Sequence, residues 1–200
     1  MFEDLNASDI AKFHDDYLSN EQLSLNEFNE NSLWFWIKVN HYNNCQLWNE
    51  EDLARRRDVA DSEIVKNKRH IDNYNQARND AIELIDEFIL LRLQKIQPIS
   101  EAWFNSETAG SIIDRLSILS LKIFNMNKQT QRLNIEDSLK QEAIDKVARL
   151  RLQRSDLQYC FNQLLYNCSI GKAYYRIYRQ FKMYNDPRFN LNIIGNKLSN

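Results

Sequence analysis

Glycine and proline are scarce in this sequence. Only three of the 200 residues are glycine and two are proline. Tight turns and β-sheets normally use more of both residues. The scarcity therefore favours an all-α fold, a bundle of long antiparallel helices joined by few turns.

An excess of charge of one sign is also lacking. Lys and Arg total 26 and Asp and Glu total 28, which gives a formal net charge of −2 at pH 7. Proteins that bind nucleic acid through its phosphates usually carry a basic surface. The balance therefore offers no electrostatic basis for a nucleic-acid partner.

Signals for export or for a membrane span are missing. No apolar run approaches the roughly 20 residues that cross a bilayer, and the acidic start lacks the basic region of a secretory signal. The three cysteines, Cys45, Cys160 and Cys168, have no paired spacing. These features predict a cytoplasmic protein with reduced thiols and no membrane span.

Two hundred residues suit a single domain, which buries about two-thirds of its unfolded surface. We expect one helical domain over 1–200, with a core at 32–187 and a tail at 188–200. Apolar residues recur at helical spacing and predict its helices. The predicted helices are Asp9 to Ser19, Asn31 or Ser32 to about Arg57, Asp61 to Lys95, Glu107 to about Met126, and Asn134 to about Tyr184 with a break near Ser169 to Gly171.

The helix predicted over 61–95 carries polar residues on its apolar face. Asn75 and Arg78 stand where the spacing calls for Leu or Ile, and Asp72, Asn79 and Asp86 lie beside them. Burial of such groups is unfavourable unless each finds a partner. The face is therefore either a polar centre or an exposed surface.

The preceding helix has a matching polar stretch at Asn40, His41, Asn44 and Glu51. A short joint makes these two helices antiparallel neighbours, so both polar sets can reach the same level. One interpretation is a ligand pocket between helices. The other is a self-satisfied hydrogen-bond network that sets the helix register.

A third polar group lies at the start of the fourth predicted helix, with Glu107, Gly110, Asp114 and Arg115. Glycine in a helix costs about 1 kcal/mol relative to alanine. Gly110 therefore indicates the close approach of a neighbouring helix or of a ligand. A helix start can also bind an anion, whereas plain capping by Ser106 is an equal alternative.

Catalytic motifs give little support for an enzyme. Glu-x-x-His and His-Glu-x-x-His are both absent, and His14 and His70 are expected on the surface. Carboxylates can still hold a divalent cation. Glu83 and Asp86 resemble one of the two acidic pairs with which all-α nucleotide pyrophosphohydrolases bind magnesium, but the other pair is missing. The proposed metal ligands are Glu51, Asp72, Glu83, Asp86 and Glu107.

Aromatic and basic residues alternate over 174–184. Such a run can stack a base or a sugar, but at helical spacing it more often packs against a core or a second subunit. We favour packing. A homodimer could form through Trp34, Trp36 or this tyrosine-rich face.

Several stretches together resemble a known family. They are Leu47-Trp48-Asn49-Glu50-Glu51-Asp52-Leu53-Ala54-Arg55-Arg56, Ile71-Asp72 with Asn75-Gln76-Ala77-Arg78-Asn79-Asp80, Ser106-Glu107-Thr108-Ala109-Gly110, Asp114-Arg115-Leu116-Ser117-Ile118-Leu119 and Tyr178-Arg179-Gln180-Phe181-Lys182-Met183-Tyr184-Asn185-Asp186-Pro187. In this order they resemble the bacterial domain-of-unknown-function family 4254, over about Leu33 to Pro187. Asn49 departs from the family, where a His is expected.

The resemblance implies a helical protein often encoded beside glycosyltransferases of envelope polysaccharide synthesis. We therefore expect an accessory or binding protein of glycan assembly that takes an anionic sugar or nucleotide, with a glycosyltransferase as a candidate partner. The alternatives are a metal-dependent hydrolase of a nucleotide or nucleotide-sugar, and a structural adaptor without a ligand. The expected ligand-binding residues are His41, Trp48, Glu51, Arg55, Asp72, Asn75, Arg78, Asn79, Glu107, Gly110, Asp114 and Arg115.

Overall fold

A computed structural model describes residues 2–19, 29–181 and 188–189 of the chain. These residues form five α-helices and one pair of very short strands, which confirms the all-α prediction. The elements are α1 (Ala7–Ser19), α2 (Leu33–Ala54), α3 (Asp61–Leu93), β1 (Trp103–Phe104), α4 (Ala109–Thr130), α5 (Asp137–Ser169) and β2 (Ala173–Tyr174).

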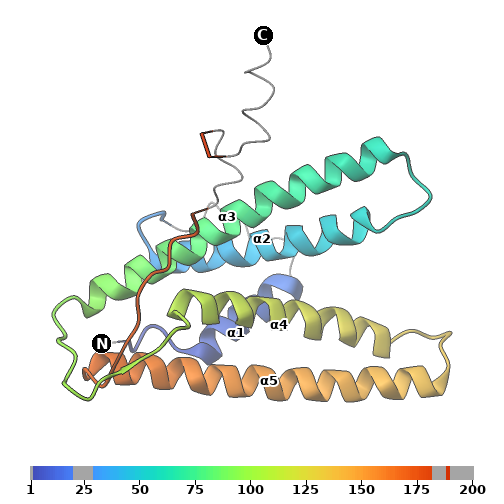
Figure 1. Ribbon diagram of the computed structural model, residues 1–200. Coiled ribbons are helices and arrows are strands. Elements are labelled where there is room, and N and C mark those ends of the chain that lie inside the picture. The colour runs from blue at the N-terminus through green and yellow to red at the C-terminus, as the bar shows by residue number, and fades with distance from the viewer. Residues whose placement is uncertain (1, 20–28, 182–187, 190–200) are drawn as a thin grey trace, which may run out of the picture.

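Two antiparallel helical hairpins make up the molecule (Figure 1). One hairpin is α2 with α3 and the other is α4 with α5, while the short α1 packs against α4 and α5. The hairpins approach each other at the end where α3 finishes and α4 begins. They diverge toward the loops 55–60 and 131–136, so the far arms do not cover each other.

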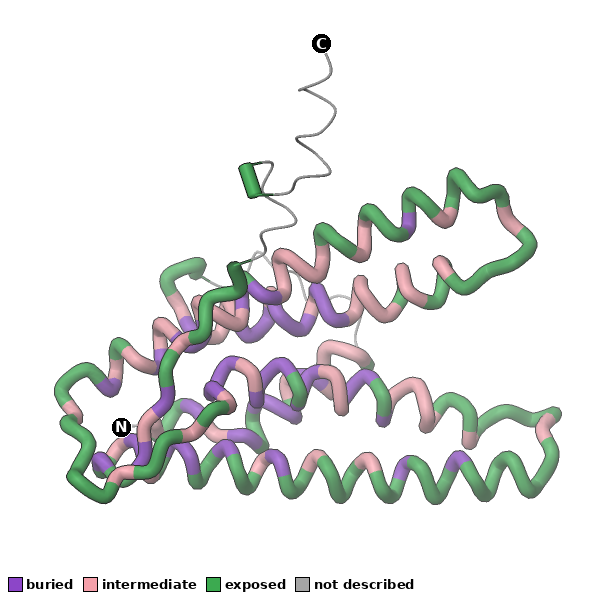
Figure 2. The backbone as a smooth tube through the Cα atoms, viewed as in Figure 1, coloured by how far each residue is buried: buried purple, intermediate pink, exposed green. Residues whose placement is uncertain are grey.

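The buried core lies where the hairpins approach each other (Figure 2). Ile37, Ile85, Ile113 and Phe161 are fully buried and come from α2, α3, α4 and α5 in turn. The diverging arms are exposed over much of their length. Each helix therefore has a buried face along only part of its length. Trp34 and Trp36, predicted for a homodimer, are partly buried against this core.

Side-chain caps confirm some helix starts and correct others. Ser32 Oγ accepts from the Phe35 amide at 3.2 Å and caps α2 as predicted. Ser106, the alternative cap for the fourth helix, does not cap α4, because Thr108 Oγ1 accepts from the Ser111 amide at 3.1 Å. In α3, Asp61 is the first helical residue, and Ala60 before it makes no side-chain cap.

The helix predicted to continue to Tyr184 ends at Ser169, where the break was expected. Gly171 has a φ of 74°, and a Cβ there would lie 2.7 Å from the backbone oxygen of Gln97. Only glycine suits this turn. The aromatic residues after it favour extended backbone, and β2 pairs in parallel with β1.

From Tyr175 to Phe181 the chain has no helix, so the helical prediction for this run is wrong. Residues 182–187, and 190–200 of the predicted tail, lie outside the described residues. In the part of the chain that the structure describes, no helix has the length and apolar character needed to cross a membrane.

Candidate functional site

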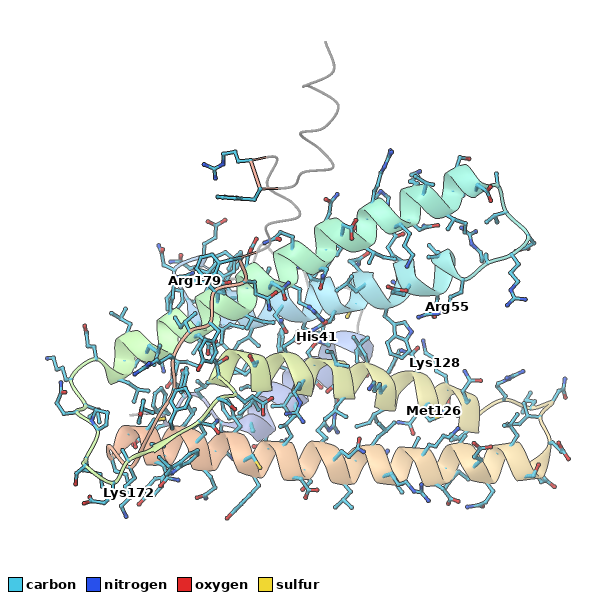
Figure 3. All side chains as sticks on the ribbon, viewed as in Figure 1. His41, Arg55, Met126, Lys128, Lys172 and Arg179 are labelled. Carbon is cyan, nitrogen blue, oxygen red and sulfur yellow. The ribbon has the colours of Figure 1, made fainter. Side chains whose placement is uncertain are left out.

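A buried polar network joins α2 to α4. Asp114 Oδ1 accepts from the side-chain amides of Asn40 and Asn44, each at 2.9 Å. Asn44 also donates to Ser117 Oγ at 3.0 Å, and His41 Nδ1 lies 2.7 Å from the same hydroxyl. All five residues are buried. The polar faces of the two helices therefore meet and satisfy one another, and His41 lies between them in Figure 3.

A stacked histidine pair continues this network toward α1. The rings of His14 and His41 have centroids 4.4 Å apart and an angle of 22° between their planes. His14 is fully buried, so its predicted surface position is wrong. Burial lowers the pKa of both rings, to about 3 for His41. Both rings are therefore neutral at pH 7, and we assign them a packing role.

Arg78 reaches the network from α3. Its Nη1 lies 3.9 Å from Asp114 Oδ2, and its Nη2 donates to Asn75 Oδ1 at 2.9 Å. Its Nε is buried and has no hydrogen-bond partner among the described residues. The side chain is 25% exposed. A guanidinium this deeply placed normally has every donor paired, so Arg78 is incompletely satisfied.

The open side of Arg78 faces a groove of about 440 Å³ between α2 and α4. Glu51 in this groove lies 3.5 Å from Arg55 and 3.7 Å from Lys68, as surface ion pairs. The groove therefore combines cations, carboxylates, an amide and an indole. Its lining residues are Asn44, Leu47, Trp48, Glu51, Asp52, Arg55, Arg78, Ile118 and Leu121.

Several predicted ligand residues converge on this groove. Trp48, Glu51, Arg55 and Arg78 line it, and Asp114 lies behind Arg78. Three more predicted residues do not line the groove. Asn75 accepts a hydrogen bond from Arg78, and His41 and Asn79 are buried. Ser117 was missed, although its position three residues after Asp114 places both on one face of a helix.

Asp72 does not join the site, and its predicted place on a buried face is wrong. It is exposed, although Asn79, seven residues later on nearly the same face of α3, is buried. Asp72 belongs to the first half of α3, and this half diverges from α4 in Figure 1, which accounts for its exposure.

Gly110 allows α3 and α4 to touch. A Cβ at this position would lie 2.5 Å from the backbone oxygen of Ile82, and its amide donates to Asp86 Oδ1 at 2.7 Å. The close approach of a neighbouring helix, one of two explanations for this glycine, is confirmed. Burial raises the pKa of Asp86 to about 6.

Glu107 and Arg115 form a separate pair. Arg115 Nη1 lies 2.5 Å from Glu107 Oε1, and both line a hollow of about 650 Å³ between α4 and α5. Neither residue lines the groove beside Arg78. Arg115 therefore already has a carboxylate partner and is not part of the Arg78 site.

The five predicted metal ligands do not gather. Glu83 binds Arg179 Nη1 at 2.7 Å and the Gln180 amide at 3.0 Å, whereas Asp86 binds Gly110 and Asp72 is exposed. Glu51 lines the groove and Glu107 pairs with Arg115 elsewhere. Over the described residues, no three His, Cys, Asp or Glu side chains are placed to hold a metal ion. The five residues therefore do not lie together as one set of metal ligands.

These features define an all-α protein of two diverging hairpins with a groove between them. The model of a family described as "Protein of unknown function (DUF4254)" matches residues 34–177. The chain belongs to that family. No curated protein and no solved structure matches the chain.

Proposed function

We propose that this protein binds a small anionic ligand, a sugar or nucleotide phosphate, in the groove between α2 and α4. The observation that carries the proposal is the state of Arg78. Its Nε is buried without an acceptor, and its nearest carboxylate lies 3.9 Å away. That carboxylate, Asp114, already accepts from two amides through its other oxygen.

An oxyanion in the groove would give Arg78 Nη1 a hydrogen-bond acceptor closer than the Asp114 carboxylate, which lies 3.9 Å away. Guanidinium groups bind phosphate and carboxylate with two parallel hydrogen bonds, and the bond is stronger where water is partly excluded. Arg55, on the wall of the same groove, is a second cation that Glu51 and Asp52 already pair with, so Arg78 is the main cation for the ligand. Asp114 holds Arg78 in place from behind and is itself fixed by Asn40 and Asn44.

The other groups of the groove suit a sugar. The Trp48 indole offers a flat apolar face with a hydrogen-bond donor at its edge. Carboxylates such as Glu51 accept hydrogen bonds from hydroxyl groups, and the Asn44 side chain carries both donor and acceptor atoms. A charged sugar would use all of these groups, whereas a simple inorganic anion would use only the cations.

We place this binding activity in cell-envelope glycan assembly, as an accessory protein beside a glycosyltransferase. The support is the resemblance to a family often encoded next to such enzymes. A groove for an anionic sugar is consistent with that setting.

Thermal unfolding with chosen probes tests the proposal. The probes are glucose 1-phosphate, mannose 1-phosphate, UDP-glucose, GDP-mannose and inorganic phosphate. At about 100 times its dissociation constant, a bound probe adds about 2.7 kcal/mol to the free energy of unfolding. Arg78→Ala should weaken binding of that probe about tenfold or more.

Arg69→Ala is the matched control, because Arg69 is an exposed arginine of the same helix. It should bind the probe as the wild type does. Equal effects of the two substitutions, or no shift with any probe, would overturn the proposal.

A structural adaptor is the second candidate, and the self-satisfied network of Asn40, Asn44, Asp114 and Ser117 favours it. In that case the polar residues serve only to set the register of α2 against α4. The same experiment separates the two functions, since an adaptor without a ligand shows no shift with any probe.

A further inference from the structure

A second hollow adjoins the groove on the far side of Trp48. Its volume is about 460 Å³, and it lies between the end of α2, α4 and α5. Trp48 lines both spaces, so the indole is their common wall. The residues that line the second hollow are Trp48, Lys122, Asn125, Met126, Gln129, Lys146, Arg149, Leu150 and Gln153.

The charge of this hollow is of one sign. Lys122 from α4 and Lys146 and Arg149 from α5 line it, and none of the described residues in its wall is Asp or Glu. Lys146 pairs with Glu142 at 2.6 Å. Lys122 and Arg149 have no ion pair within the described part of the chain. Lys122 and Arg149 thus place two cations without an ion pair among the described residues at the wall of this hollow, and Lys122 also borders the hollow that holds Glu107.

The neutral groups of the hollow suit a ring with polar edges. Asn125, Gln129 and Gln153 carry carboxamides, which both donate and accept hydrogen bonds as nucleobase edges require. Met126 and Leu150 provide apolar surface, and Figure 3 shows Met126 on the side of α4 that faces α5. Cations, carboxamides and an apolar floor together match a nucleoside phosphate.

We propose that this hollow binds the nucleoside and the adjoining phosphate of a ligand whose sugar and sugar-linked phosphate occupy the groove beside Arg78. The ligand class is then a nucleoside-diphosphate sugar, with the phosphate next to the nucleoside at Lys122 and Arg149 and the sugar-linked phosphate at Arg78, past Trp48. This inference rests on the proposed function, because it assigns the sugar to that groove. The combined space suits such a ligand, since small-molecule sites commonly span about 300–1,000 Å³.

Isothermal titration calorimetry on the full chain tests the inference. The probes are UDP-glucose, GDP-mannose and ADP-glucose, each compared with its own nucleoside diphosphate and with glucose 1-phosphate or mannose 1-phosphate. We expect one nucleotide sugar to bind at least tenfold more tightly than its sugar 1-phosphate. The matching nucleoside diphosphate should bind alone and compete with it.

Lys122→Ala and Arg149→Ala should each weaken binding of that nucleotide sugar about tenfold, while the affinity for the sugar 1-phosphate stays within about twofold. Lys128→Ala is the control. Lys128 is a lysine of α4 that lies over the Phe124 ring at 4.2 Å and lines neither hollow. All three side chains are exposed, so the variants should fold.

The outcomes separate this inference from the proposed function. Two outcomes overturn the inference alone. In one, the sugar 1-phosphate binds as tightly as the nucleotide sugar. In the other, Lys122→Ala and Arg149→Ala leave the affinity for the nucleotide sugar unchanged. Absence of binding by every probe overturns the proposed function as well.

Discussion

At the scale of single residues, Asp114 is the centre of the site. One carboxylate oxygen accepts from Asn40 and Asn44, and the other faces Arg78. The same side chain therefore joins the structural network to the groove. A buried carboxylate of this kind is stabilised only while its donors remain in place.

Asp114→Ala should lower the free energy of unfolding by about 3 kcal/mol, because it leaves the buried Asn40 amide without an acceptor and removes one of the acceptors of the Asn44 amide. Asp114→Asn should cost less, since its amide oxygen can still accept. Urea denaturation measures both values. Arg115→Ala, which removes only an ion pair with Glu107 on a half-exposed surface, should cost less than about 1 kcal/mol. Equal losses for Asp114→Ala and Arg115→Ala would contradict the assigned role.

At the scale of helices, the contact of α3 with α4 at Gly110 sets where the hairpins meet. The backbone oxygen of Ile82 leaves no room for a Cβ there. Because backbone atoms cannot move aside as a flexible side chain does, the two helices must separate when this position is enlarged. The groove lies along α4 from this contact, so its width depends on it.

Gly110→Ala should destabilise the protein by about 1–3 kcal/mol from overpacking, even though alanine favours a helix by about 1 kcal/mol. Chemical denaturation measures the loss. Carbon NMR of the Asp86 carboxyl group gives an independent readout. Burial, the largest influence, raises the pKa of Asp86, and the hydrogen bond from the Gly110 amide lowers it by less. Separation of the helices admits water to Asp86, so that pKa should fall from about 6 toward its ordinary value. An unchanged stability and pKa would show that the contact is not tight.

At the scale of the whole molecule, two kinds of buried group give stability opposite dependences on pH. Burial raises the pKa of Asp86 to about 6, so the folded state binds its proton more tightly than the unfolded state does. The contribution of Asp86 to the free energy of unfolding therefore grows as pH falls from 6 toward 4. Burial lowers the pKa of His14, with smaller effects from His41 and Arg154. The unfolded state then binds the proton more tightly, and stability is lost as pH falls below about 6.5.

Between pH 7 and pH 5, charging of the unfolded state at His14 should cost the wild type about 2 kcal/mol of unfolding free energy. His14→Leu should therefore show a smaller loss over this interval. Asp86→Asn should show a loss larger by about 1 kcal/mol, because the stabilising protonation is removed. Urea titrations at the two pH values measure both differences. Parallel behaviour of the two variants and the wild type would contradict the assigned burial.

The sequence by itself determined the all-α class, the limits of α2, α3 and α4 to within a few residues, and the polar residues of α2 and α3 that face other helices. Helical periodicity carries this information, because residues three and four apart share a face. Asn44, Asn79 and Arg78 were found in this way. The reason for Gly110 was also available, since a glycine near a helix start suggests a close contact.

Only the tertiary structure decided how far along each helix the buried face extends. Asp72 and Asn79 share a face of α3, but only Asn79 is buried. The hairpins approach each other at one end and diverge toward the other, so this face is covered along only part of α3. The strand conformation after Gly171 and the approach of Arg78 to Asp114 likewise depend on residues distant in the chain. Local spacing specifies a face, whereas the angle between packed helices specifies which part of that face meets a neighbour.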